Sequence, residues 1–184
     1  MAEMKVDKTW LIKRDLITID EVIGRGQFGT VHLGVYQRST VAIKKIHEVA
    51  NDAQRQAAAK ALDREVKALT RVRHPNVVRL IGACTDPPML IMAYAPNRTL
   101  RHVLDKKELS LNERLKLVKG VAKGMCALHA TQPYILHLDL KPPNVLIGKD
   151  MVPWITDFGL ASIMLTSMSA GSTRSGRGTM QVSI

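Results

Sequence analysis

Apolar and polar positions tend to alternate along the first part of the chain, between residues 16 and 46. The apolar positions of this stretch fall into short runs separated by polar or glycine-rich breaks; they are Leu16, Ile17, Ile19, Val31, Leu33, Val35, Val41 and Ile43. Alternation with a period of two is typical of half-buried strands, and breaks of this kind indicate turns. We therefore expect three antiparallel strands here.

The pattern becomes helical between residues 51 and 72. Asn51 and Gln54 have the spacing of a capping box, and the run Ala57–Ala61 is rich in alanine, the residue with the highest helix propensity. The sequence His74-Pro75-Asn76 ends this helix, because the residue before a proline avoids helical backbone angles.

Two further apolar runs, at 77–83 and 89–94, predict a fourth and a fifth strand separated by the turn Asp86-Pro87-Pro88. Residues 95–98 have the composition of a linker. Helical spacing follows, first in a short helix after Thr99 and then in a long helix over 111–129, which a capping box of Ser110 and Glu113 begins. The predicted architecture is α+β: a five-stranded lobe with one main helix, followed by a mainly helical lobe.

The long helix is apolar on most of its circumference. One stripe consists of Leu111, Leu115, Val118, Ala122 and Met125, and a second of Leu117, Val121 and Leu128. A helix with two apolar faces needs packing partners on both. Only short segments follow residue 130, so we expect the helical lobe to be incomplete in this chain.

The chain of 184 residues is strongly basic, with 27 Lys and Arg against 16 Asp and Glu and a net charge of +11. Such a charge is typical of proteins with a phosphate-bearing partner, and also of proteins whose basic residues only solvate the surface. The basic residues form no dense run and do not interleave with aromatic residues, so we expect no nucleic-acid partner.

Other features favour an intracellular protein without a membrane partner. No apolar run approaches membrane-spanning length, and residues 1–13 lack the apolar core of a signal peptide. The two cysteines, Cys84 and Cys126, form no CxxC and have no metal-ligand spacing, which favours a reducing compartment. We expect both to be small core residues and the protein to be cytoplasmic.

The first motif with chemical meaning is Gly24-Arg25-Gly26-Gln27-Phe28-Gly29-Thr30-Val31. Three glycines at this spacing allow backbone N–H groups to approach phosphate oxygens closely. The same spacing marks dinucleotide sites, where it joins a strand to a helix. Here strands are predicted on both sides, which favours a hairpin loop over a dinucleotide site.

A lysine follows on the third strand, in Val41-Ala42-Ile43-Lys44. In an alternating strand Lys44 points away from the side of Ile43, into a cleft beneath the glycine loop. Glu65 on the predicted helix is the natural acidic partner. The plainer interpretations are an exposed strand lysine and a solvated helix carboxylate.

Two later clusters carry carboxylates. His137-Leu138-Asp139-Leu140-Lys141-Pro142-Pro143-Asn144 places a carboxylate, a cation and an amide on one loop before the apolar strand 145–147. Thr156-Asp157-Phe158-Gly159 supplies a second carboxylate, followed by the conformational freedom of a glycine.

In this order the four motifs resemble the eukaryotic protein kinase domain. The resemblance covers about residues 16–179. The segments VAIK, EVKALTRVRHPNVVRLIGAC and APNRTL are most similar in sequence to the tyrosine-kinase-like group, whose members are mostly specific for serine and threonine. Lys141, two residues after Asp139, also fits a Ser/Thr kinase.

The resemblance implies a function and a set of roles. The protein would transfer the γ-phosphate of ATP, with Mg2+ as cofactor, to Ser or Thr hydroxyls of protein substrates. Asp139 would accept the proton of the substrate hydroxyl, Lys141 would steady the γ-phosphate, and Lys44, paired with Glu65, would hold the α and β phosphates.

Asn144 and Asp157 would hold Mg2+. The nucleotide would lie against Ile23, Gly24, Gly26, Phe28, Gly29, Val31, Ala42, Lys44, Met92, Ala93 and Ala95. Within this set Met92 would be the gatekeeper, and backbone groups of Ala93 and Ala95 would bond adenine.

This sequence departs from the family at three places. Leu138 replaces a common arginine that binds a phosphorylated activation loop, Ala93 replaces a common acidic residue, and the chain stops after residue 184, where similar kinases continue. The expected division is an extension at 1–15, an N-lobe at 16–94, a partial C-lobe at 95–161 and a truncated activation segment at 162–184. An alternative function is therefore a weakly active or inactive nucleotide-binding module that competes for the partners of full-length relatives.

Overall fold

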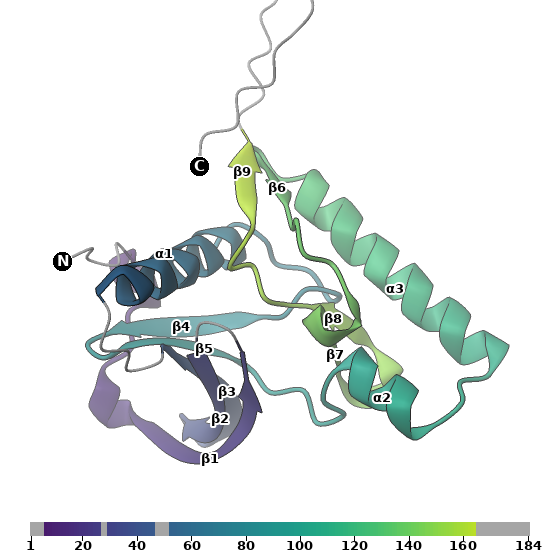
Figure 1. The fold of residues 1–184 in the computed structure, drawn as a ribbon, viewed down its shortest axis with the longest axis horizontal. Coiled ribbons are helices and arrows are strands. Elements are labelled where there is room, and N and C mark those ends of the chain that lie inside the picture. The colour runs from purple at the N-terminus through teal and green to yellow at the C-terminus, as the bar shows by residue number, and fades with distance from the viewer. Residues whose placement is uncertain (1–5, 27–28, 47–51, 165–184) are drawn as a thin grey trace, which may run out of the picture.

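The computed structural model describes residues 6–26, 29–46 and 52–164 (Figure 1). The expected helix cap at Asn51 and most of the expected activation segment lie outside the described residues. Within them the chain forms a sheet lobe with helix α1 and a second lobe built around helices α2 and α3. The predicted α+β kinase-like architecture is confirmed.

The first lobe is a five-stranded antiparallel sheet with the strand order β1-β2-β3-β5-β4. Its strands are β1 (Ile17–Arg25), β2 (Gly29–Tyr36), β3 (Ser39–Ile46), β4 (Leu80–Thr85) and β5 (Pro88–Ala93). The two central strands divide their side chains between two apolar clusters, since Ile43 and Ile91 pack on one face while Leu90 and Met92 pack on the other. Alternation with a period of two therefore fixes which residues face α1.

Helix α1 (Asp52–Leu69) ends three residues before the predicted boundary at residue 72. The Thr70 hydroxyl donates to the Lys67 carbonyl at 3.1 Å, and the Arg71 N–H donates to the Ala68 carbonyl at 3.1 Å. These bonds close a turn instead of continuing the helical ladder. The helix therefore stops before His74-Pro75-Asn76, and the predicted role of that segment as the terminator was wrong.

Strand β4 begins at Leu80, three residues after the predicted start. The residues before it pair with the second lobe instead: the Val78 N–H donates to the Ile155 carbonyl and the Ile155 N–H donates to the Asn76 carbonyl, each at 2.9 Å. This apolar segment therefore pairs with a strand that is distant in sequence. The alternation of apolar and polar residues does not reveal such a pairing.

The second lobe contains α2 (Leu100–Lys106), α3 (Leu111–His129) and four short strands. These are β6 (Tyr134–Leu136), β7 (Val145–Ile147), β8 (Pro153–Ile155) and β9 (Ser162–Met164), which pair as β6–β9 and β7–β8. The predicted capping box of Ser110 and Glu113 is present at the start of α3. Lys107 and the N–H and hydroxyl of Ser110 lower the pKa of the Glu113 carboxyl to about 2.

Helix α3 buries most of one of its two apolar stripes and exposes most of the other. Leu117 and Leu128 are buried, together with Gly120 and Gly124 between them. Leu111, Leu115 and Val118 are 71%, 57% and 67% exposed. The described residues thus cover only one face of this helix.

The prediction for the cysteines was half wrong. Cys84 is buried in the sheet, whereas Cys126 is exposed on α3 because it lies off the face that packs on β8. Both thiols are free. Among the described residues, no helix is long and apolar enough to cross a membrane.

Candidate active site

Lys44 lies at the centre of a charged cluster between the lobes. Its position on β3 turns its side chain away from the side of Ile43, as alternation predicts. Lys44 Nζ donates to Glu65 Oε2 at 2.6 Å and to Asp157 Oδ1 at 2.9 Å. Burial alone lowers the pKa of Lys44, but the opposite charges of Glu65 and Asp157 together outweigh it and raise the pKa to about 12. The lysine is therefore a permanent cation.

Glu65 comes from α1 and is only 1% exposed. Burial raises the pKa of this carboxyl, and the charge of Lys44 opposes that rise. A carboxylate this deep needs its cation. The interpretation of Glu65 as a solvated surface residue is therefore wrong.

The glycine loop lies at the tip of the β1–β2 hairpin, as predicted. Gly24 pairs with Val31 in the strand register, and the Gly26 N–H donates to the Gly29 carbonyl at 2.8 Å. A Cβ on Gly29 would overlap the Lys45 carbonyl, so this glycine also permits close packing against β3. Phe28 lies outside the described residues.

The predicted adenine-facing residues lie on the central strands and just after β5. Ala42 pairs with Met92 across β3 and β5, and both are buried. The Ala93 N–H donates to the Arg79 carbonyl at 3.0 Å, so it is not available to a ligand. The N–H of Ala95 bonds no described residue, while its carbonyl accepts from Arg98 at 3.3 Å.

The loop after β6 holds Asp139 between a cation and an amide. Lys141 Nζ lies 2.7 Å from Asp139 Oδ2, and Asn144 Nδ2 donates to the same oxygen at 2.9 Å. The hydrogen bond from Lys141 is the main reason that the pKa of Asp139 lies below its usual value, and the bond from Asn144 adds to it. Asp139 is thus an ionised carboxylate at the protein surface.

His137 connects this loop to the one that carries Asp157. Its Nδ1 accepts from the Asp139 N–H at 3.3 Å, and its Nε2 lies 2.9 Å from the Thr156 carbonyl. Burial lowers the pKa of the imidazole, which fits a neutral ring whose Nε2–H donates to Thr156. The Thr156 N–H also donates to the Asn144 carbonyl at 3.0 Å, so the two loops are held in register.

Two residues of these loops have left-handed backbone angles. Leu138 has a φ of 61° and Asp157 a φ of 66°. Non-glycine residues in this region indicate strain that the surroundings enforce. With this backbone conformation the Asp157 carboxylate points toward Lys44. The next residue, Phe158, is fully buried, and its ring centroid lies 4.9 Å from that of His137.

Two side-chain oxygens that accept none of these hydrogen bonds, Asn144 Oδ1 and Asp157 Oδ2, are of the type that binds magnesium. Both hydrogen bonds of the Asn144 amide go through its nitrogen to Asp139, so its Oδ1 remains an open acceptor among the described residues. Asp157 binds Lys44 through Oδ1, and its Oδ2 has no partner in the same part of the chain. Mg2+ is bound typically by one or two such oxygens together with substrate phosphates.

Comparison with known proteins agrees with this geometry. The family model described as protein tyrosine and serine/threonine kinase matches residues 17–182. The serine/threonine-protein kinase CTR1 of Arabidopsis thaliana is 40% identical over 167 residues, which are 85% of this chain and 20% of that protein. The probable serine/threonine-protein kinase SIS8 of the same plant is 35% identical over 168 residues, 85% of this chain and 16% of that protein.

A similar match comes from the U-box domain-containing protein 70 of Oryza sativa subsp. japonica, 34% identical over 156 residues, 82% of this chain and 19% of that protein. The chain therefore belongs to the protein tyrosine and serine/threonine kinase family. It spans no more than about a fifth of the length of these three relatives.

The structure brings the predicted residues together in two groups. Lys44, Glu65 and Asp157 form one, and Asp139, Lys141 and Asn144 form the other. His137 belonged to a predicted motif but had no predicted role, and Thr156 had none either. Both act through bonds that involve backbone atoms, which residue type does not reveal.

Proposed function

We propose that this chain transfers the γ-phosphate of Mg·ATP to Ser or Thr hydroxyls of protein substrates. One observation carries the proposal: Lys44 is bound at once to Glu65 of the first lobe and Asp157 of the second. Asn144 bonds Asp139 through its side chain and accepts from the N–H of Thr156, the neighbour of Asp157, through its carbonyl. A phosphoryl transfer with a loose transition state needs positioned charges more than covalent help.

In this proposal each group has one task. Lys44 holds the α and β phosphates, and Asp139, ionised and exposed toward solvent, orients the substrate hydroxyl and accepts its proton. Lys141 neutralises the γ-phosphate. Asn144 and Asp157 would hold Mg2+, which when bound would neutralise charge on the phosphates.

The adenine is expected to bond the carbonyl of Ala93 and the N–H of Ala95. The buried residues Ala42 of β3 and Met92 of β5 would form an apolar wall of the adenine site. The nucleotide would be covered by residues of the glycine loop and its flanking strands: Ile23, Gly24, Gly26, Phe28, Gly29 and Val31. The preference for serine and threonine rests on Lys141 and on the names of the relatives. We also propose a cytoplasmic location, which the two free thiols support.

The test is phosphate transfer from labelled Mg·ATP to a generic basic protein by purified residues 1–184. Asp139→Asn is expected to lower the rate at least about 100-fold, since general-base contributions are of that order. Asp150→Asn, the same change at an exposed aspartate, is the matched control and leaves the rate unchanged. Equal rates for both variants would refute the role of Asp139.

The alternative is a module that binds nucleotide without transferring phosphate and competes for partners of longer kinases. The exposed face of α3 at Leu111, Leu115 and Val118 favours it, because a surface so apolar suits a contact with another protein. Nucleotide binding without any Asp139-dependent transfer would decide for this alternative.

A further inference from the structure

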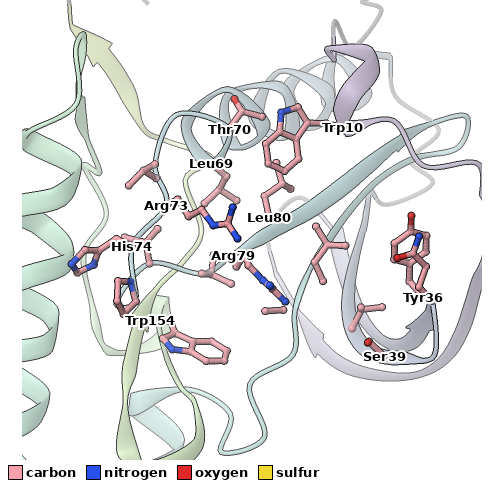
Figure 2. A pocket seen from close by; sticks show the side chains of 18 residues that line it. Trp10, Tyr36, Ser39, Leu69, Thr70, Arg73, His74, Arg79, Leu80 and Trp154 are labelled. Carbon is pink, nitrogen blue, oxygen red and sulfur yellow. The ribbon is translucent and has the colours of Figure 1, made fainter.

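Figure 2 shows a pocket whose described lining includes none of the three residues of the charged cluster, Lys44, Glu65 and Asp157. It has a volume of about 880 Å³ and is bordered by Trp10, by the β2–β3 turn at Tyr36, by the end of α1 and by Trp154 of β8. Among the described residues, it shares only Ala93 with the candidate active site. Its size lies within the range of pockets that hold small ligands or a few residues of a peptide.

The described residues that line the pocket carry positive charge and no negative charge. Arg73 and Arg79 line it, and Figure 2 shows both side chains extending into the space between the two tryptophans. No aspartate or glutamate is among its described lining residues. Neither guanidinium group forms a hydrogen bond or ion pair with any described residue. Both cations are therefore available to a ligand.

The walls between the arginines are apolar and aromatic. Trp10, Tyr36 and Trp154 are each half-buried and line the pocket, so part of each side chain remains open to it. Aromatic walls of this kind take up a large apolar or aromatic side chain. Guanidinium groups bind carboxylates through two parallel hydrogen bonds.

We propose that this pocket binds an acidic peptide segment that carries one large apolar or aromatic side chain between carboxylates. The net charge of +11 attracts such a segment and repels a second copy of the chain, so the peptide is favoured over self-association. The apolar side chain enters between the tryptophans, and the flanking carboxylates pair with Arg73 and Arg79.

The chain offers a direct readout, because Trp10 and Trp154 are its only two tryptophans and both line the pocket. The probe is a capped peptide, Glu-Asp-Glu-Phe-Glu-Asp-Glu, added to residues 1–184 without nucleotide while tryptophan emission is recorded. A saturable change in emission is expected. The peptides with Gly in place of Phe, or Lys in place of every acid, and inorganic phosphate alone, are expected to bind at least about tenfold more weakly.

The variants separate local pairing from long-range attraction. Arg73→Ala/Arg79→Ala is expected to raise the Kd at least about tenfold. Arg71→Ala/Lys119→Ala removes the same charge at two exposed positions outside the pocket and is expected to change the Kd less than about threefold. Arg73→Gln and Arg79→Gln, which keep most of each side chain, serve if the double alanine variant does not fold.

Three results would overturn the proposal. They are the absence of a saturable emission change, an equal loss of affinity in both double variants, and an emission change that follows protein concentration without peptide, which would assign the surface to a second copy. Since no nucleotide is present, failure of the proposed kinase activity leaves this test unaffected.

Discussion

At the scale of single residues, Lys44 and Glu65 depend on one another for stability as well as for the proposed chemistry. Lys44→Met leaves Glu65, which is 1% exposed, without its cation. We expect this variant to lose about 3 kcal/mol of unfolding free energy, because an unpaired buried charge is costly. Urea unfolding at neutral pH measures the loss.

The double variant Lys44→Met/Glu65→Met is the control for this prediction. Replacing a buried ion pair by apolar side chains of similar size is close to neutral, so we expect more than half of the lost stability to return. If the double variant is less stable than Lys44→Met alone, the two side chains are not energetically coupled in this way.

The sequence was sufficient to predict which residue types meet at this site. Lys44, Asp139, Asn144 and Asp157 stand in motifs whose order identifies them, and Glu65 follows from the need for an acidic partner. The sequence alone does not reveal the hydrogen bonds that hold these side chains in position. The links from His137 to Thr156 involve backbone atoms, whose partners depend on the path of the whole chain.

At the scale of elements, α3 packs through glycines that the hydrophobic pattern did not single out. A Cβ on Gly124 would lie 2.6 Å from the Asn76 carbonyl oxygen, and a Cβ on Gly120 would lie 2.5 Å from Pro153 Cγ. The two glycines thus allow the helix to approach β8 and the segment before β4 closely. Apolar periodicity found the helix but not this contact face.

Gly124→Ala tests this contact. In an exposed helix the change from glycine to alanine gains up to about 1 kcal/mol. Here we expect a loss of about 1–3 kcal/mol, because the backbone of Asn76 has to move. Val118→Ala, on the exposed face of the same helix, is the control and is expected to stay within about 0.5 kcal/mol of the parent. A more stable Gly124→Ala would contradict the close approach.

Element boundaries were predictable where local chemistry sets them. The capping box at Ser110 and the turn predicted at 86–88 depend on neighbouring residues. The capping box is present, and the turn lies at 86–87, since β5 already begins at Pro88. Strand β9 and the late start of β4 depend on partner strands far along the chain. The pattern of apolar and polar residues does not reveal such distant partners. Strand β9 was therefore not predicted, and the start of β4 was predicted too early.

At the scale of the whole molecule, the two lobes share one apolar core. A single buried cluster contains Leu62 and Val66 of α1, Met92 of β5, and Phe158 and Leu128 from the second lobe. The ion pair between Lys44 and Asp157 crosses the same boundary. We therefore expect the lobes to unfold in one cooperative transition rather than in two.

A thermal melt of residues 1–184 with and without Mg·ATP tests the nucleotide site and this coupling together. A ligand at about 100 times its Kd adds roughly 2.7 kcal/mol, which raises the melting temperature by roughly 5–10 °C in a domain of this size. Because the proposed site takes residues from both lobes, the single transition is expected to move as a whole.

The controls address the proposed magnesium site. The shift in melting temperature is expected to shrink when Mg2+ is chelated, and also in Asp157→Asn, which weakens that site. It is not expected to shrink in Asp105→Asn, which changes an exposed aspartate outside the site. Two separate transitions, of which only one responds, would contradict the shared core. An equal shift with and without Mg2+ would contradict the assignment of Asn144 and Asp157.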